Sequence, residues 1–449
     1  MAGTATVLTT AEALQSGAST ARAEADRCLA AAADPAGQGA KVFTLVDPGR
    51  TRAEADASDL LRSRGVVPSP LAGIPVSLKD LFDVAGQVTR AGSTVLDPGP
   101  AAADAPVVAR LRAAGAVFVG RTNMTEFAYS GVGMNPHYGT PAAPWDRTTG
   151  RVPGGSTSGG AVSVADGMAV AALGTDTGGS CRIPAACCGI VGFKPTQRRV
   201  PLDGCTPLSF SLDSIGPMAR TVSCVALLDA VLAGEPAAVP APVSLRGLRI
   251  AVPTNYVLDR MDETVGATFE RALTRLSSAG AQVDEIRVDL LDRLPELTLN
   301  GGITAAEAYA WHRDLIEAEG NRYDPNVRTR ILMGKSLTAE AYLTAIRTRK
   351  ELIAEAEKAL AGVDVLAMPT IPIVPPTIAE MADTDTFADL NRLMLRNPSV
   401  ANMLDRCAIS LPVGEPGGAP VGLSLVGPAM GDRRLLSIAL AAEATLATK

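Results

Sequence analysis

Two serines in glycine-rich turns are the residues of this sequence best suited to chemistry. Ser156 ends a Gly-Gly-Ser turn, and Ser180 ends a second such turn 24 positions further along the chain. Glycine lets the backbone approach a ligand closely, and the N–H groups of such a turn can hold an anion. Each serine is therefore a candidate nucleophile, but a serine hydroxyl reacts slowly until a neighbouring base takes its proton.

A histidine base is the first possibility, and the chain has only two histidines, His137 and His312. A Ser-His-Asp site needs one of them beside the nucleophile. His137 lies in a loop that could border a site, whereas His312 lies in a segment with helical spacing, where packing is the commoner role. Neither serine lies in a G-x-S-x-G elbow, so the sequence gives only weak support to a Ser-His-Asp site.

A lysine base is the second possibility, because burial can lower the pKa of lysine until the neutral amine predominates. None of the seven lysines follows a serine by three positions, so the Ser-x-x-Lys pattern is absent. A Ser–Lys site would have to combine separate segments. Lys79 follows the apolar run Ile74–Leu78. Considered alone, it is typical of a surface lysine whose stem covers the end of a strand.

Nucleotide and metal sites find little support. No lysine follows the Gly/Ser-rich run as a phosphate loop requires, and the dinucleotide fingerprint does not fit the glycine spacing. Cys187 and Cys188 are adjacent rather than spaced as in zinc sites. Asp383, Asp385 and Asp389 lack the glycine and glutamate of a calcium loop. We therefore expect no cofactor and no metal.

Composition limits the partners. The chain has 449 residues, of which 47% are hydrophobic, and a net charge of −6 without a block of Lys or Arg, so we expect no nucleic-acid partner. Seven cysteines at irregular spacing indicate reduced thiols and a cytoplasmic protein. The first residues lack the pattern of a signal peptide, and no apolar run reaches the ~18 residues of a membrane span.

Helix–glycine–strand units predict an α/β fold. They occur over 106–120 and 246–287, and further strands are expected near 364–370 and over 408–427. Residues 1–65 and 301–362 show helical spacing of apolar residues. We predict a helical N-terminal segment, 1–65, packed on one large domain formed by residues 66–449.

Motifs around the two serines resemble those of the amidase signature family. They are IPVSLKD around Lys79, PGGSTSGG at 153–160 and GTDTGGSCRIPAACCGIVGFKPT at 174–196. Further segments follow in the family's order at 120–139, 212–220, 364–370 and 420–428. The resemblance spans most of the chain and implies a twisted, mixed central β-sheet covered on both faces by helices.

The resemblance also implies a catalytic triad. Ser180 would be the nucleophile, Ser156 a bridging serine that follows a cis peptide bond, and Lys79 the base. The oxyanion hole would consist of four backbone N–H groups, those of Thr177, Gly178, Gly179 and Ser180. Asp176 and Arg182, which flank this turn, would hold its shape rather than act chemically.

The expected reaction is hydrolysis of the C–N bond of a small-molecule amide, or of a carbamate. The segment Ala128, Tyr129, Ser130 and Gly131 is expected to contact the substrate. Position 183 is Ile. The resemblance implies that family members cleaving malonamide-type acids have an arginine at this position, which would hold a carboxylate. This difference argues against a small dicarboxylic amide held at that position and leaves aryl amides, amino-acid amides and carbamates open.

Two other functions remain open at this point. The chain could be the glutaminase subunit of a tRNA-dependent amidotransferase, which would act on glutamine within a hetero-oligomer. It could also be a catalytically inactive binding protein on the same fold, although the complete set of Lys79, Ser156 and Ser180 argues against this. For a stand-alone hydrolase we expect a monomer or a homodimer.

Overall fold

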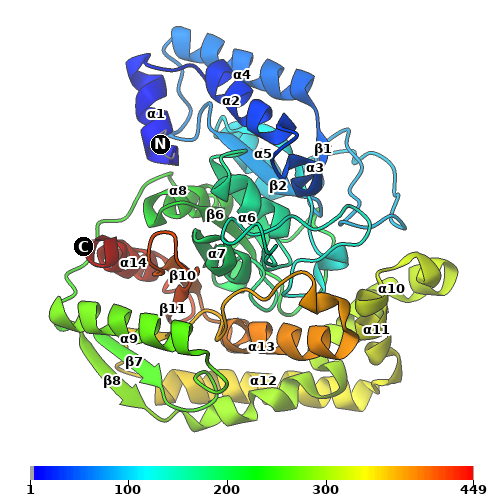
Figure 1. The fold of residues 1–449 in the computed structure, drawn as a ribbon, viewed down its shortest axis with the longest axis vertical. Helices are drawn as coiled ribbons and strands as arrows, with labels where there is room; N and C mark the ends of the chain where they lie inside the picture. Colours follow the sequence, from blue (N-terminus) through cyan, green and yellow to red (C-terminus); the bar gives the residue numbers. More distant parts are fainter. Residues whose placement is uncertain (1–4, 448–449) are drawn as a thin grey trace.

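An eleven-stranded sheet runs through the molecule (Figure 1). The computed structural model describes residues 5–447. The strands lie in the order β1 (Phe43–Val46), β3 (Val117–Thr122), β2 (Pro75–Lys79), β4 (Ala171–Thr175), β6 (Ile215–Ala219), β5 (Val191–Lys194), β10 (Ala408–Pro412), β11 (Gly422–Val426), β9 (Val365–Pro369), β7 (Arg249–Pro253) and β8 (Gln282–Ile286). Strand β2 pairs in parallel with β3 and β4, whereas β4 pairs antiparallel with β6. The predicted mixed sheet of a single α/β domain is confirmed.

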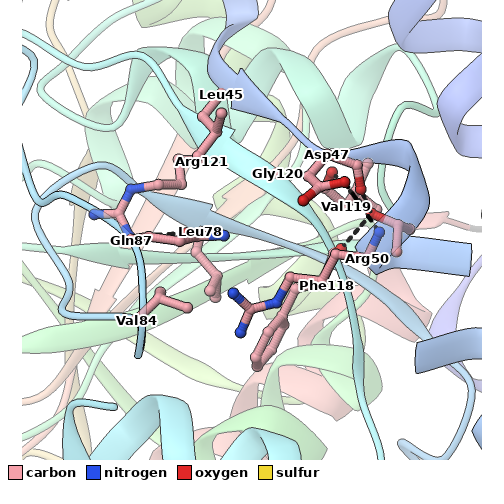
Figure 2. A pocket seen from close by; sticks show the side chains of 11 residues that line it. Leu45, Asp47, Arg50, Leu78, Val84, Gln87, Phe118, Val119, Gly120 and Arg121 are labelled. Atoms are coloured by element: carbon pink, nitrogen blue, oxygen red, sulfur yellow. Dashed lines mark hydrogen bonds between the residues drawn. The ribbon is translucent and has the colours of Figure 1, made fainter. Parts of the chain in front are cut away.

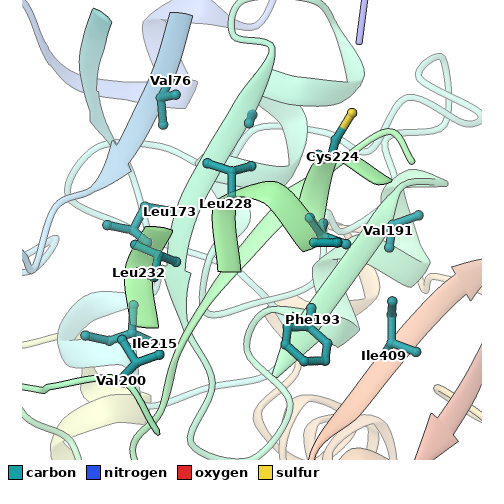
Figure 3. Close-up of a cluster of buried hydrophobic side chains, with 14 of the residues drawn as sticks. Val76, Leu173, Val191, Phe193, Val200, Ile215, Cys224, Leu228, Leu232 and Ile409 are labelled. Carbon is teal, nitrogen blue, oxygen red and sulfur yellow. The ribbon is translucent and has the colours of Figure 1, made fainter. Parts of the chain in front are cut away.

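Helices cover both faces of this sheet, as the alternation of side chains along β5 shows. Val191 and Phe193 pack with Leu228 and Leu232 of α8 (Val222–Ala233) in one apolar cluster (Figure 3). Gly192 points the other way, where a Cβ would lie 2.7 Å from Ala185 of α7 (Arg182–Cys188). Successive residues of a strand face opposite sides of a sheet, so α7 and α8 lie on opposite faces.

The remaining helices extend these two layers or connect them. Near the N-terminus they are α1 (Val7–Ser16), α2 (Ala21–Ala33), α3 (Gly39–Val42), α4 (Pro48–Ser63), α5 (Pro106–Ala113) and α6 (Ser158–Ala165). Further along they are α9 (Glu263–Ser278), α10 (Gly302–Glu319), α11 (Pro325–Met333), α12 (Ala339–Ala359), α13 (Thr384–Met403) and α14 (Asp432–Ala447). Helices α13 and α12 are neighbours in the lower part of Figure 1, where both contribute to one apolar cluster with β9.

The predicted helix–glycine–strand units are present. Helix α5 is followed by Gly115 and β3, and α9 is followed by Gly280 and β8. Both glycines have positive φ, +87° and +100°, a conformation that other residues rarely adopt. Each glycine therefore reverses the chain after its helix, so that the next strand can join the sheet.

The N-terminal segment is not purely helical, which corrects the prediction for residues 1–65. Strand β1 pairs antiparallel with β3 and forms one edge of the sheet. The strand is only four residues long and follows directly on α3, so the helical spacing on either side hid it. A division of the chain at residue 65 stays a prediction.

A small cavity lies between β1, β3 and α4, away from the two serines (Figure 2). Its lining includes Leu45, Leu78, Phe118 and Arg121, and its volume is about 20 Å³. That is room for about one water molecule. The cavity is therefore too small to hold a substrate. No helix within residues 5–447 is long and apolar enough to cross a membrane.

We predict that Gly216→Ala weakens the sheet. Gly216 lies in β6, where an added Cβ would stand 2.0 Å from the carbonyl oxygen of Phe193. Overpacking of this kind costs about 1–3 kcal/mol, so the midpoint of thermal unfolding should fall. Gly49→Ala in α4 is the matched control, because its nearest neighbour would be 3.4 Å away. Equal midpoints for both variants would contradict the packing described here.

Candidate active site

Lys79, the last residue of β2, is completely buried. Val76 and Leu78 enter the apolar core on one face of the sheet, whereas Ser77 turns to the other face and bonds to Ser163 of α6 at 2.9 Å. The same alternation directs Lys79 towards the segment that leads into α6. The interpretation of Lys79 as a surface lysine is therefore wrong.

The Lys79 amine has two hydrogen-bond partners, both hydroxyl groups. Its Nζ donates to Ser156 Oγ at 2.8 Å and to Thr175 Oγ1 at 2.8 Å. Burial lowers the pKa of Lys79 to about 8, although the negative charges of Asp213 and Asp176 partly oppose this effect. Desolvation disfavours the charged form of an amine, so a sizeable fraction of Lys79 is neutral near pH 8 and can accept a proton.

The first serine turn is fixed by its backbone. The Gly155–Ser156 peptide bond is cis. The N–H of Gly155 donates to the carbonyl of Gly131 at 2.8 Å, and the N–H of Thr125 donates to the carbonyl of Ser156 at 3.1 Å. A Cβ at position 155 would stand 2.5 Å from the nitrogen of Gly133. Only glycine fits there, because the loop of residues 121–152 passes so close.

The second serine turn connects β4 to α7 and lies against the first. The N–H of Thr157 donates to the carbonyl of Ser180 at 3.3 Å. Ser180 keeps 3% of its surface exposed, whereas Ser156 keeps none. No hydrogen bond between the two hydroxyls is present in the described part of the chain. Lys79 is therefore hydrogen-bonded to Ser156, and Ser180 is the more exposed of the two serines.

Three backbone N–H groups of the second turn have no acceptor within residues 5–447, those of Thr177, Gly178 and Ser180. The N–H of Gly179 differs from the sequence-based expectation, because it donates to Asp176 Oδ1 at 2.9 Å. Unpaired N–H groups clustered at a turn can stabilise a negative oxygen. The three free donors are thus available for this role, and Gly179 is engaged in holding the turn.

A buried carboxylate organises this turn. Asp176 Oδ1 accepts from Arg182 Nη2 at 2.8 Å and Asp176 Oδ2 accepts from Arg182 Nε at 3.0 Å, and both side chains are fully buried. The N–H groups of Gly179 and Cys181 also donate to this carboxylate. The positive charge of Arg182 lowers the pKa of Asp176 to about 2, against the opposing effect of burial. The pair therefore stays ionised and shapes the turn.

The expected substrate segment lies beside the first turn. Ala128 has a φ of +60°, and Gly131 is bound through its carbonyl to Gly155 and through its N–H to Asn391 Oδ1 at 2.8 Å. Ser130 Oγ also donates to Asn391 Oδ1. The ring of Tyr129 is buried and faces Arg330. These contacts place the segment next to Ser156.

Three supporting residues were not singled out in the sequence. Asp213 accepts from Thr177 Oγ1 at 2.5 Å and from the N–H groups of Leu208 and Ser209, and burial raises its pKa to about 6. Asn402 of α13 donates to Asp176 at 3.0 Å. Asp213 lies in the motif at 212–220 and could have been noticed there. Asn391 and Asn402 are polar residues within a helical pattern and carry no signal of their own.

Both histidines are engaged away from the serines. His137 Nε2 lies 2.9 Å from Glu126 Oε1, and His312 Nδ1 lies 3.0 Å from the hydroxyl of Tyr323. Burial lowers the pKa of His312 to about 3. The geometry thus gives no support to a histidine base. Within residues 5–447, no three His, Cys, Asp or Glu side chains gather as a metal site would need.

Sequence comparison aligns this chain with known proteins over most of the length of both. A family model described as "Amidase" matches residues 29–436. The chain is 40% identical over 405 residues to a 2-amino-5-chloromuconic acid deaminase of Comamonas testosteroni, covering 89% of this chain and 87% of that protein. It is 36% identical over 435 residues to a glutamyl-tRNA(Gln) amidotransferase subunit of Roseiflexus castenholzii, covering 89% and 87%.

Solved structures agree over nearly the whole chain. A crystal structure of an amidase superimposes with a TM-score of 0.88 and 34% identity, covering 98% of this chain and 99% of that one. The native peptide amidase of Stenotrophomonas maltophilia gives a TM-score of 0.82 and 27% identity, covering 100% and 98%.

Arg182→Met should destabilise the fold strongly. The change leaves the Asp176 carboxylate buried without its cation, and breaking a buried pair costs about 3–5 kcal/mol. Chemical denaturation followed by tryptophan fluorescence measures the loss. Arg22→Met is the matched control, because it breaks only exposed pairs with Asp26 and Asp56, which contribute little to stability. Equal losses in the two variants would contradict the structural role given to Asp176 and Arg182.

Proposed function

The chain belongs to the amidase family, and on that premise we propose that it hydrolyses small-molecule amides through an acyl-enzyme on Ser180. The observation that carries the proposal is the fully buried Lys79 amine, 2.8 Å from Ser156 Oγ, with its pKa lowered to about 8. A buried amine of lowered pKa is what a lysine base requires. In the proposed relay, Ser156 passes the proton between this base and the more exposed Ser180.

The proposed steps follow from these positions. Neutral Lys79 takes a proton from Ser156 as Ser156 takes one from Ser180, whose Oγ attacks the substrate carbonyl. The N–H groups of Thr177, Gly178 and Ser180 stabilise the oxyanion. The proton returns through Ser156 to the nitrogen of the leaving amine, the C–N bond breaks, and water then hydrolyses the ester on Ser180. The mechanism requires the Ser180 and Ser156 hydroxyls to come within hydrogen-bond distance of each other when the proton is transferred.

The proposed substrates are acyl or aryl amides, with carbamates as a further class. The relative from Comamonas testosteroni is a 2-amino-5-chloromuconic acid deaminase by name. The relative from Roseiflexus castenholzii is a subunit of a glutamyl-tRNA(Gln) amidotransferase by name. The first name supports release of ammonia from an amino-substituted acid as a second candidate, since 40% identity extends over 89% of this chain. The seven free cysteines are the ground for proposing a cytoplasmic location.

A substrate panel tests the proposal. It contains anilides, primary amides, esters, carbamates and glutamine, with ammonia and aniline as the products measured. We expect turnover of at least one amide, and Ser180→Ala should lower kcat by about 10³-fold or more. Ser158→Ala is the matched control, since the Ser158 hydroxyl is buried two positions after Ser156 and has no hydrogen-bond partner. Undiminished turnover by Ser180→Ala would contradict the assignment, and turnover of glutamine alone would favour the amidotransferase function.

The pH dependence follows from the lowered pKa of Lys79. Lys79 must be neutral to act as a base, so kcat/KM should rise through about pH 8 and level off above it. Initial rates with an uncharged anilide measure this, because such a substrate does not titrate between about pH 6 and pH 10. A profile that stays flat over this range contradicts the role of Lys79.

A further inference from the structure

Glu307 of α10 is a buried carboxylate that the proposed steps do not use. Within residues 5–447, no arginine, lysine or histidine comes close enough to form an ion pair with it. Four hydrogen-bond donors surround it instead, namely the hydroxyls of Ser209, Ser211 and Tyr342 and the N–H of Ser211. A buried charge costs free energy unless hydrogen bonds compensate it. A displaced carboxylate would lose these bonds, so Glu307 and its donors hold one another in place.

Three of the four donors come from one loop, residues 208–213, which precedes β6. Glu307 Oε2 accepts from Ser209 Oγ at 2.6 Å and from the N–H of Ser211 at 3.0 Å, and Oε1 accepts from Ser211 Oγ. Tyr342 of α12 donates to Oε1 at 2.7 Å. Glu307 therefore fixes the 208–213 loop against α10 and α12.

The same loop reaches the second serine turn through Asp213. The N–H of Ser209 donates to Asp213 Oδ2 at 3.0 Å while its hydroxyl donates to Glu307, so Ser209 links the two carboxylates. Asp213 Oδ1 accepts from Thr177 Oγ1 at 2.5 Å. The position of Thr177 thus depends on the 208–213 loop, which Glu307 holds.

We infer that Glu307 is a positioning residue for the oxyanion hole. Through Ser209 it fixes Asp213, and Asp213 fixes Thr177, whose N–H is one of the three free donors of the second turn. Donors that are already in place stabilise a developing negative oxygen most effectively. The inference rests on the proposed hydrolysis and adds to it a residue that acts through Asp213 and Thr177 rather than on the substrate.

Steady-state kinetics with the amide of the substrate panel that is hydrolysed fastest test the inference. Glu307→Ala releases the loop, and since a displacement of about 1 Å can cost about 10²-fold in rate, kcat should fall by about 10²-fold. KM should stay unchanged, because the oxyanion forms only as the transition state is approached. Rates are expressed per Ser180 that a fluorophosphonate labels at completion, so unfolded molecules do not count. Glu317→Ala, exposed on the same helix, is the matched control and should leave both constants unchanged.

Two further variants separate positioning from stability. Glu307→Gln keeps the shape, because its amide oxygen can accept from Ser209 and the N–H of Ser211 while its NH2 group donates to the hydroxyls of Ser211 and Tyr342. Most of kcat should therefore return, and a loss equal to that in Glu307→Ala contradicts the inference. Ser209→Ala cuts the link between the two carboxylates and leaves Glu307 its other three donors. It should lower kcat with KM unchanged.

The rate at which the fluorophosphonate labels Ser180 is a second measurement, and it needs no amide turnover. The phosphoryl oxygen requires the same donors, so labelling should be slower in Glu307→Ala and Ser209→Ala than in Glu317→Ala. Wild-type kcat and labelling rate in the first two variants, or a raised KM with unchanged kcat, overturn the inference. Slower labelling in these two variants of an enzyme that cleaves no amide overturns the proposed hydrolysis and supports the positioning role. A wild-type enzyme that is not labelled at all overturns both.

Discussion

The burial of one amine, that of Lys79, is the constraint on which the site depends. An ammonium group removed from water loses its hydration, and the two hydroxyls of Ser156 and Thr175 replace it only in part. The balance shifts towards the neutral amine, which is why the pKa of Lys79 falls to about 8. The apolar run that buries β2 thus lowers the pKa of the amine that we propose as the base.

The second serine turn depends on a different kind of burial. Asp176 stays ionised inside the protein because Arg182 neutralises it and backbone N–H groups complete its hydrogen bonds. Such a pair contributes little net stability but fixes one geometry, because any displacement leaves a charge unpaired. The neighbouring N–H groups of Gly178 and Ser180 have no acceptor within residues 5–447. In the proposed mechanism the buried amine of Lys79 supplies reactivity, and the buried pair of Asp176 and Arg182 holds the shape of the second turn.

The sequence predicts the parts of the fold that have strong local patterns. The helix–glycine–strand units and the two serine turns were located correctly because glycine and apolar spacing act within a few residues. Strand β1 was missed because four residues carry too little pattern between two helices. Lys79 by itself indicated a surface residue, and only the resemblance to a family connected it with Ser156.

Contacts between distant segments were beyond prediction. Asn391 and Asn402 belong to a helix more than 200 positions from the turns they support, and their roles depend on how α13 packs against α7. The engagement of the Gly179 N–H by Asp176 likewise appears only in three dimensions.

Covalent labelling tests whether Lys79 activates Ser180 through Ser156. The protein is treated with a serine-directed fluorophosphonate, and the modified peptide is identified by mass spectrometry. We expect a single adduct on Ser180, and a rate of labelling that falls by about 10²-fold or more in Lys79→Met, the range typical of a lost general base. An adduct on another serine, or labelling of Lys79→Met at the wild-type rate, would contradict it.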